Sequence, residues 1–216
     1  SPKPGSLFAD NYNLALLRPD LYHADGQIKD EVYVYGSFLQ SKMHAKGVRC
    51  SNCHEPHSAE LKAEGNAVCT QCHNPQGNSN FPSLKRQSYD VPSHHMHQQE
   101  GVGAQCVSCH MPAKTFMVVD PRRDHSFRVP RPDLSVKLGT PNACTDCHSD
   151  KTAEWAADHT IKWFPKGRTG RPHFAEIFSK ANGPETEDEV IQGLVDYATS
   201  IENPAIVRAT SISKLA

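Results

Sequence analysis

The segment CSNCHEPH, residues 50–57, holds two cysteines and a histidine within five residues and a second histidine three residues later. The same pattern returns as CTQCH at 69–73, CVSCH at 106–110 and CTDCH at 144–148. These four segments contain all eight cysteines of the 216-residue chain. Any interpretation of the sequence must therefore explain the eight cysteines together.

Two familiar uses of cysteine do not explain the histidines. Cys53 and Cys69 are separated by fifteen residues, as in a four-cysteine zinc ribbon, and an even number of cysteines also permits a disulfide framework. Neither arrangement requires histidine directly after the second cysteine of every pair. With 13 histidines in 216 residues, four such placements by chance have odds of roughly one in 10⁵.

Covalently attached haem c requires every residue of the pattern. Each thiol of a CxxCH motif bonds one vinyl group of the macrocycle, and the histidine that follows becomes the proximal ligand of the iron. The sequence therefore predicts four haems c. They would be attached through Cys50, Cys53, Cys69, Cys72, Cys106, Cys109, Cys144 and Cys147, with His54, His73, His110 and His148 as proximal ligands.

The remaining nine histidines are more than four haems need as second, distal ligands. Iron held between two imidazoles is closed to substrates and exchanges electrons with little rearrangement. We expect three haems to be bis-histidine coordinated, through His57, His125 and at least one histidine of the cluster SHHMH at 93–97. Within that cluster the pattern leaves His94, His95 and His97 as alternatives.

The fourth distal ligand has two candidates, Met43 and His44. Residues 31–48, EVYVYGSFLQSKMHAKGV, have the apolar periodicity of one helix, with Met43 on its apolar stripe and His44 beside it. A thioether ligand would raise the potential of its haem. The other three histidines, His23, His159 and His173, are expected at the surface or behind the ligands.

Composition favours a haem-filled interior. Only 37% of the residues are hydrophobic and 7% aromatic, while sixteen prolines and thirteen glycines indicate much irregular backbone. We expect a mainly α fold with much irregular structure and little sheet, a multihaem cytochrome c fold organised around four covalently bound haems. The net charge of −1 gives no sign of nucleic-acid binding. No apolar stretch is long enough for a membrane span, and without a signal peptide the chain is expected to be a mature form.

The chain is expected to contain two parts, a tetrahaem domain at 1–184 and a helical hairpin at 185–216 that would begin a helical repeat. In the first part, residues 151–164 predict a helix with Trp155, His159 and Trp163 on one face, and residues 115–120 predict one short strand. In the second part, a capping box formed by Thr186 and Glu189 predicts one helix start. Asn203–Pro204 predicts the other, as N-cap and first helical residue.

Two segments carry a resemblance to a known family: GVRCSNCHEPHSAELKAEGNAVCTQCHNP at 47–75, and residues 94–150 from HHMH to CTDCHSD. They resemble exported multihaem cytochromes with doubled haem motifs, in the class that includes the pentahaem nitrite reductases and hydroxylamine oxidoreductase. The resemblance covers about residues 30–170. It implies closely packed haems, largely bis-histidine ligation, electron transfer outside the cytoplasm and, often, helical repeats after the haem region.

The nitrite reductases of this class differ from the chain at two positions. They have Ser-x-His before the analogous GVxCxxCH motif, with that histidine as a distal ligand, whereas Ser41-Lys42-Met43 has this spacing here. The comparison favours Met43 over His44. The same enzymes bind their catalytic haem through lysine in place of the motif histidine, and no CxxCK motif occurs in this chain. This difference argues against nitrite reduction.

The sequence thus predicts an electron carrier that works between redox partners or along an assembly of identical subunits, in the periplasm or outside the cell. The alternative is a reductase or oxidase of a small nitrogen or sulfur compound at one five-coordinate haem. Basic residues near the haem motifs are expected to neutralise haem propionates: Arg49, Lys114, Arg122, Arg123, Arg128 and Arg131.

Overall fold

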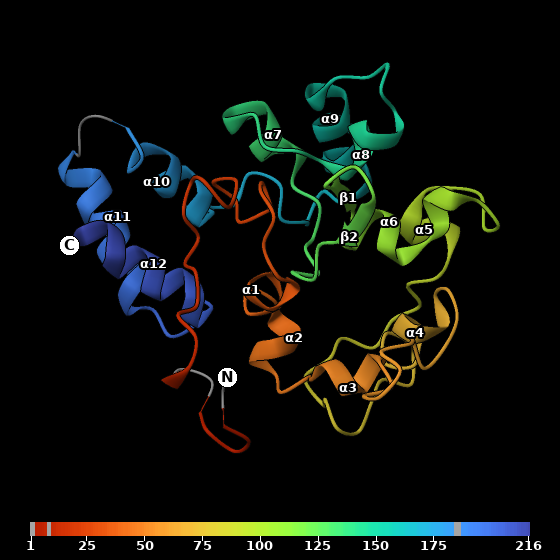
Figure 1. The fold of residues 1–216 in the computed structure, drawn as a ribbon. Coiled ribbons are helices and arrows are strands. Elements are labelled where there is room, and N and C mark those ends of the chain that lie inside the picture. Colours follow the sequence, from red (N-terminus) through yellow and green to blue (C-terminus); the bar gives the residue numbers. More distant parts are fainter. Residues whose placement is uncertain (1–2, 8–9, 184–186) are drawn as a thin grey trace.

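The computed structural model describes residues 3–7, 10–183 and 187–216 as short helices joined by long irregular segments (Figure 1). This confirms the mainly α fold class with little sheet. The first half contains α1 (Val34–Phe38), α2 (Lys42–Ala45), α3 (Cys50–Cys53), α4 (Ala67–Thr70), α5 (Pro92–His95), the 3-10 helix η2 (Val102–Ala104) and α6 (Cys106–His110). The second half contains β1 (Ala113–Phe116), β2 (Asp120–Arg123), α7 (Pro132–Leu138), α8 (Ala143–Cys147), α9 (Ala153–Trp163), α10 (Phe174–Lys180), α11 (Asp188–Thr199) and α12 (Ala205–Leu215).

Three CxxCH motifs lie on the short helices α3, α6 and α8, and the second motif begins in α4, which ends at Thr70 before the turn that holds Cys72. One helical turn brings residues i and i+3 to the same side, so it directs both cysteines of a motif towards one face. In α8 the turn is capped by Asn142, whose side chain accepts a hydrogen bond from the Thr145 N–H at 3.1 Å. The four motif helices follow one another in chain order along one side of the molecule (Figure 1).

The prediction of a single helix over residues 31–48 is wrong, because this stretch forms two helices, α1 and α2. Ser41 lies between them in extended conformation, and its side chain accepts a hydrogen bond from the His44 N–H at 3.0 Å. This capping bond begins a new helix, since an N-cap serine has non-helical backbone angles. A serine in an apolar periodic stretch thus acted as a helix boundary.

The strand predicted at 115–120 is only partly correct. Residues 113–116 and 120–123 form an antiparallel hairpin, with Phe116 paired to Asp120, and the predicted strand covers its turn. Met117 and Val118 at the turn have positive φ angles of 48° and 69°, a conformation that side chains with a Cβ rarely adopt. The sequence also gave no sign of α7 and α10, two helices of seven residues each.

A side-chain core exists, and it lies at one end of the molecule. It joins the N-terminal segment to α10, α11 and α12, which lie side by side in Figure 1. Within it the Leu17 N–H donates a hydrogen bond to Thr210 Oγ1 at 3.1 Å across 193 residues of sequence. The buried members of the core are Leu17, Tyr22, Ile28, Phe116, Phe178, Val190, Leu194, Ile206 and Val207, and Phe116 alone comes from the region between the first and last CxxCH motifs.

The molecule as a whole is more open than a compact monomer. The accessible surface is 13670 Å², whereas a compact protein of 23.9 kDa exposes about 9,900 Å². The excess is more than a third of the expected area. Together with the one-sided core, it matches a fold in which the motif region is organised around prosthetic groups.

The C-terminal helical hairpin is present as α11 and α12. Its predicted starts need correction: α12 has Pro204 as N-cap instead of Asn203, and Glu187 is the N-cap of α11 without a side-chain cap bond. Thr186 of the predicted capping box lies outside the described residues, as does the proposed domain boundary. The hairpin packs on α10 and on the N-terminal segment, so it shares their core.

Candidate functional site

Three of the four motif histidines face a second imidazole in nearly parallel orientation. His54 faces His125, with ring centroids 6.5 Å apart and planes at 29°. His110 faces His94 at 6.2 Å and 11°. His148 faces His97 at 6.2 Å and 30°.

These separations are those expected for two imidazoles that ligate one iron ion. A metal–imidazole nitrogen bond is about 2 Å long and the ring centroid lies about 1.1 Å beyond the nitrogen, so two opposed rings should be about 6.2 Å apart. Direct stacking of two rings would place them closer. The residues present therefore fit haem iron in the three pairs.

Hydrogen bonds orient several of these rings through Nδ1. His54 donates to the Ala59 carbonyl at 2.7 Å and His110 to the Arg128 carbonyl at 2.7 Å. His125 donates to the Arg123 carbonyl at 2.9 Å. A carbonyl oxygen only accepts, so the ring proton lies on Nδ1 and Nε2 is free to bind metal.

His97 also has its ring proton on Nδ1, because this nitrogen donates to the His95 carbonyl at 2.5 Å. Its Nε2 is therefore free to bind metal as well. His95 itself points elsewhere: its Nε2 lies 3.4 Å from Gln99 Oε1. Of the three clustered histidines that the sequence left as alternatives, the structure thus brings His94 and His97 to motif histidines.

The second motif differs from the others. Among the described residues, His73 has a ring contact with Tyr89, edge-on at 5.7 Å, and none with a histidine. Burial, followed by the nearby charge of His110, lowers the pKa of His73, which keeps the imidazole neutral and able to ligate.

The other predicted distal ligands are not paired with a motif histidine in the described part of the chain. The His57 side chain is 96% exposed and lies 3.6 Å from a carboxylate oxygen of Glu55. His44 is exposed and packs edge-on against Phe38 at 5.3 Å, while Met43 is half-buried. These three positions remain predictions.

The histidines expected not to ligate have other surroundings. His159 lies between Trp155 and Trp163 on α9, with ring centroids 4.4 and 5.3 Å away. This confirms the predicted shared face of the helix. His173 caps α10 by accepting a hydrogen bond from the Ala175 N–H, and burial lowers the pKa of half-buried His23.

Cysteines of consecutive motifs lie close to one another in space. Burial and then the nearby Cys72 thiol raise the pKa of Cys53, and a hydrogen bond to Cys106 raises that of Cys69. Burial raises the pKa of Cys109 to about 11, with Cys144 and Cys147 as further causes. The first motif therefore neighbours the second, the second neighbours the third, and the third neighbours the fourth.

Asn66 and Tyr89 strengthen the junction between the second and third motifs, and neither was singled out from the sequence. The Asn66 amide oxygen accepts from the Cys106 N–H at 2.9 Å, while its nitrogen donates to the Ala104 carbonyl at 3.0 Å. Tyr89 is edge-on to both His73 and His94. Tyr89 comes just before the SHHMH cluster, and this proximity is the one signal that could have indicated its role.

The two alternative uses of cysteine do not match the geometry. All eight cysteines, which lie within the described ranges, are free of disulfide bonds. No group of three or more His, Cys, Asp or Glu side chains suited to a metal ion occurs in the described part of the chain. A four-cysteine zinc site would require such a group.

Comparison with known proteins gives two matches. Residues 43–85 match the doubled CXXCH motif family. The fold matches the crystal structure of the outer cell wall cytochrome OcwA, with a TM-score of 0.51 and 18% sequence identity over 99% of this chain. The chain spans 57% of the length of that structure. A search of curated proteins gives no match.

The repeated CxxCH motif, the doubled-motif match and the shared fold together support a multihaem c-type cytochrome. Its cofactor is covalently bound haem c. None of the described helices combines the length and apolar character that crossing a bilayer requires.

Proposed function

We propose that the chain carries electrons through four haems c and does not catalyse a reaction on a substrate. The observation that carries the proposal is the set of three facing imidazole pairs, His54 with His125, His110 with His94, and His148 with His97. Two strong ligands close both faces of an iron ion. A closed site exchanges electrons with little structural change and leaves no position for a substrate.

The order of the motifs supports a path for these electrons. Cys53 lies near Cys72, the Cys69 thiol is hydrogen-bonded to that of Cys106, and Cys109 is close to the fourth motif. Haems attached at neighbouring cysteines would lie next to one another. Electrons would then move in chain order, from the first haem to the fourth or in reverse.

For the second haem, attached at Cys69 and Cys72, we propose a distal ligand from outside the three pairs. Met43, His44 and His57 are the candidates that the sequence provides. Met43 would give histidine–methionine ligation and a higher potential, whereas either histidine would complete a bis-histidine set. The half-buried position of Met43 and its spacing from Ser41 favour it.

We place the protein outside the cytoplasm, in the periplasm or beyond it. Haem c is attached after export, and the structurally similar OcwA is described as an outer cell wall cytochrome. The partners would be other redox proteins or identical subunits in an assembly. The predicted division into residues 1–184 and 185–216 is part of this proposal, with the hairpin as the start of a helical repeat.

A second candidate function follows from the second motif. Because His73 faces no histidine among the described residues, its haem could be five-coordinate. An open iron position would allow reduction or oxidation of a small nitrogen or sulfur compound. The absence of a CxxCK motif argues against nitrite as that compound.

Carbon monoxide titration of the reduced holoprotein separates the two functions, because carbon monoxide binds only iron with a vacant or weakly held position. We expect far less than one equivalent to bind, and no turnover with nitrite or hydroxylamine. Binding of one equivalent together with measurable turnover would refute the electron-carrier proposal and assign catalysis to the second haem.

A further inference from the structure

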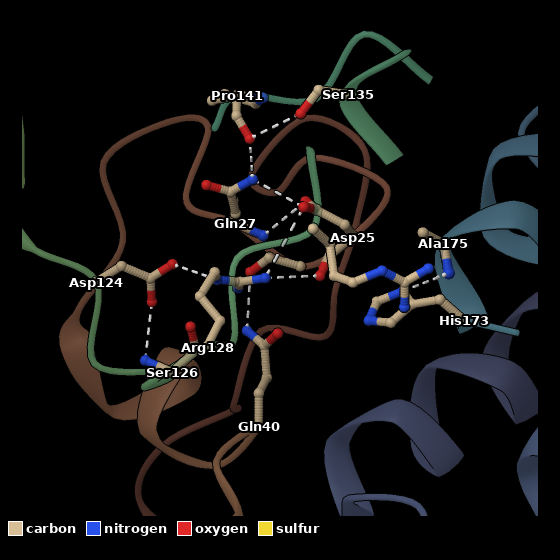
Figure 2. Close-up of polar contacts among 12 residues, drawn as sticks. Asp25, Gln27, Gln40, Asp124, Ser126, Arg128, Ser135, Pro141, His173 and Ala175 are labelled. Carbon is tan, nitrogen blue, oxygen red and sulfur yellow. Dashed lines mark hydrogen bonds and ion pairs between the residues drawn. The ribbon is translucent and has the colours of Figure 1, made fainter. Parts of the chain in front are cut away.

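A cavity of about 180 Å³ with both polar and apolar walls lies beside the third motif. It is partly open and is lined by the N-terminal segment, the junction of α1 and α2, the connection from β2 to α7, and the starts of α8 and α10. Cys109 of the third motif lies in its wall, and so does Phe127, whose ring contacts His125 at 5.9 Å. The cavity therefore lies between the third motif and His125, the distal ligand proposed for the first haem. Figure 2 shows the polar contacts of several residues that line it, among them Asp25, Gln27, Ser126, Arg128 and His173.

Arg128 is the central residue of this cavity. Its Nε donates to Asp124 Oδ2 at 3.0 Å and its Nη1 to the Asp25 carbonyl at 3.1 Å (Figure 2). Its remaining nitrogen, Nη2, is buried and has no hydrogen-bond partner among the described residues. A buried guanidinium nitrogen without a partner is costly, so an acceptor is expected beside it.

Two further donors line the same cavity. Ser126 Oγ is buried and, within the described ranges, also without a partner. His173 Nδ1 accepts a hydrogen bond from the Ala175 N–H at 3.2 Å, so its proton lies on Nε2. Burial lowers the pKa of His173 to about 4, so the ring is neutral at pH 7 and offers one N–H.

The charges around the cavity favour a negative ligand. Four cationic side chains and one carboxylate line it: Lys42, Arg128, Arg131, Arg168 and Asp25. Asp124 and Asp133 compensate Arg128 and Arg131 from outside the lining, at 3.0 and 2.7 Å. The Asp25 carboxylate is in turn held by the Gln27 side-chain nitrogen at 2.7 Å. Residues with free donors and a surplus of cationic side chains thus line the same cavity.

The same arginine contacts the third motif directly, since its backbone carbonyl accepts the hydrogen bond from His110 Nδ1. Of the six basic residues expected to neutralise propionates, Arg128 combines this contact with an unpartnered buried nitrogen. Arg122, Arg131 and Arg128 all have carboxylate partners, Arg128 through Asp124 at 3.0 Å and Asp25 at 3.9 Å, so the unpartnered Nη2 is what distinguishes Arg128. The structure therefore singles out Arg128 within that set.

We propose that this cavity binds a carboxylate group through Arg128 Nη2, Ser126 Oγ and His173 Nε2, and that the bound group and Arg128 together set the potential of the third haem. The effect on potential rests on the proposed function, whereas carboxylate binding does not. The carboxylate has two possible sources, a haem propionate and a small dissolved anion. Propionates leave a haem at the edge opposite its thioethers, so Cys109 in the wall points to a neighbouring haem as the donor.

The crystal structure of the holoprotein, before and after soaking in formate, tests the binding. A haem carboxylate within hydrogen-bond distance of Arg128 Nη2 before soaking supports the proposal and identifies the propionate source. Density for formate that appears at the same nitrogen only after soaking supports it with a dissolved anion as the source. Water alone in both crystals overturns it.

Redox titration of Arg128→Gln, followed by electron paramagnetic resonance, tests the effect on potential. Loss of the cation beside a carboxylate should disfavour reduction of the third haem about tenfold, or about 59 mV for a one-electron couple. Arg123→Gln is the matched control, because the Arg123 carbonyl also accepts a bond from a ligand imidazole but its side chain is exposed. Equal shifts in the two variants would contradict the proposed effect.

Arg128→Lys keeps the charge without the second donor nitrogen, and it replaces Arg128→Gln if that variant does not fold. A potential below that of the unchanged protein supports a requirement for the guanidinium donors, and an unchanged potential contradicts it. None of these outcomes depends on carbon monoxide binding or turnover. Failure of this inference is therefore distinguishable from failure of the electron-carrier proposal.

Discussion

Without covalent haem, residues 42–164 are expected to lose their ordered structure. The helices that carry the motifs contain four or five residues each, and isolated helices shorter than about 12 residues are marginal in water. The side-chain core lies at the other end of the molecule, around α10, α11 and α12. Replacing all eight cysteines by serine should therefore remove most of the helical signal of this region in far-ultraviolet circular dichroism.

Two comparisons make this experiment specific. The double variant Cys144→Ser/Cys147→Ser removes only the last attachment site, and it should leave the first three motifs ordered. Hydrogen exchange of the eight-serine variant should show more protection in α11 and α12 than in α3 to α8, because their core consists of side chains. An eight-serine chain with the circular dichroism of the holoprotein would refute a fold organised around haem.

Each of the variants His94→Ala, His97→Ala and His125→Ala should convert one haem from low spin to high spin. Each of these imidazoles faces a motif histidine at 6.2 to 6.5 Å, so its removal opens one iron position. The reduced variant should bind about one more equivalent of carbon monoxide than the unchanged protein. Added imidazole should restore the low-spin spectrum, which a merely structural defect would not allow.

His95→Asn is the matched control for these variants. His95 belongs to the same cluster but points to Gln99, and asparagine keeps an acceptor near the His97 N–H. We expect no change in spin state. A high-spin haem in this control, or none in His94→Ala, would show that the geometric assignment within the cluster is wrong.

The motif chemistry was predictable from sequence because covalent haem attachment requires fixed residues at fixed spacing. Four CxxCH segments predicted the cofactor class, low apolar content predicted a haem-filled interior, and the many prolines and glycines predicted irregular backbone. The helix at 151–164 was also predicted, since its apolar period is clear and Thr152 caps it in the structure. Such local signals need no knowledge of distant contacts.

Features set by tertiary contacts were not predictable. The pairing of His97 with His148 joins residues far apart in the chain, and nothing in SHHMH distinguishes His95 from its neighbours until the backbone is in place. The break at Ser41 overrode a continuous apolar stripe, because a capping hydrogen bond outweighs periodicity there. Likewise, the free nitrogen of Arg128 becomes evident only when Asp25 and Asp124 occupy its other two sites.

The central claim is that one chain holds four covalent haems. The most direct test is the intact mass of the purified holoprotein, measured after denaturation in acid and organic solvent, which removes haem that is not covalently bound. The account predicts the polypeptide mass plus four haem units, with haem absorbance retained on the denatured chain. A mass that corresponds to the polypeptide alone, or to the polypeptide with four disulfide bonds, would contradict it.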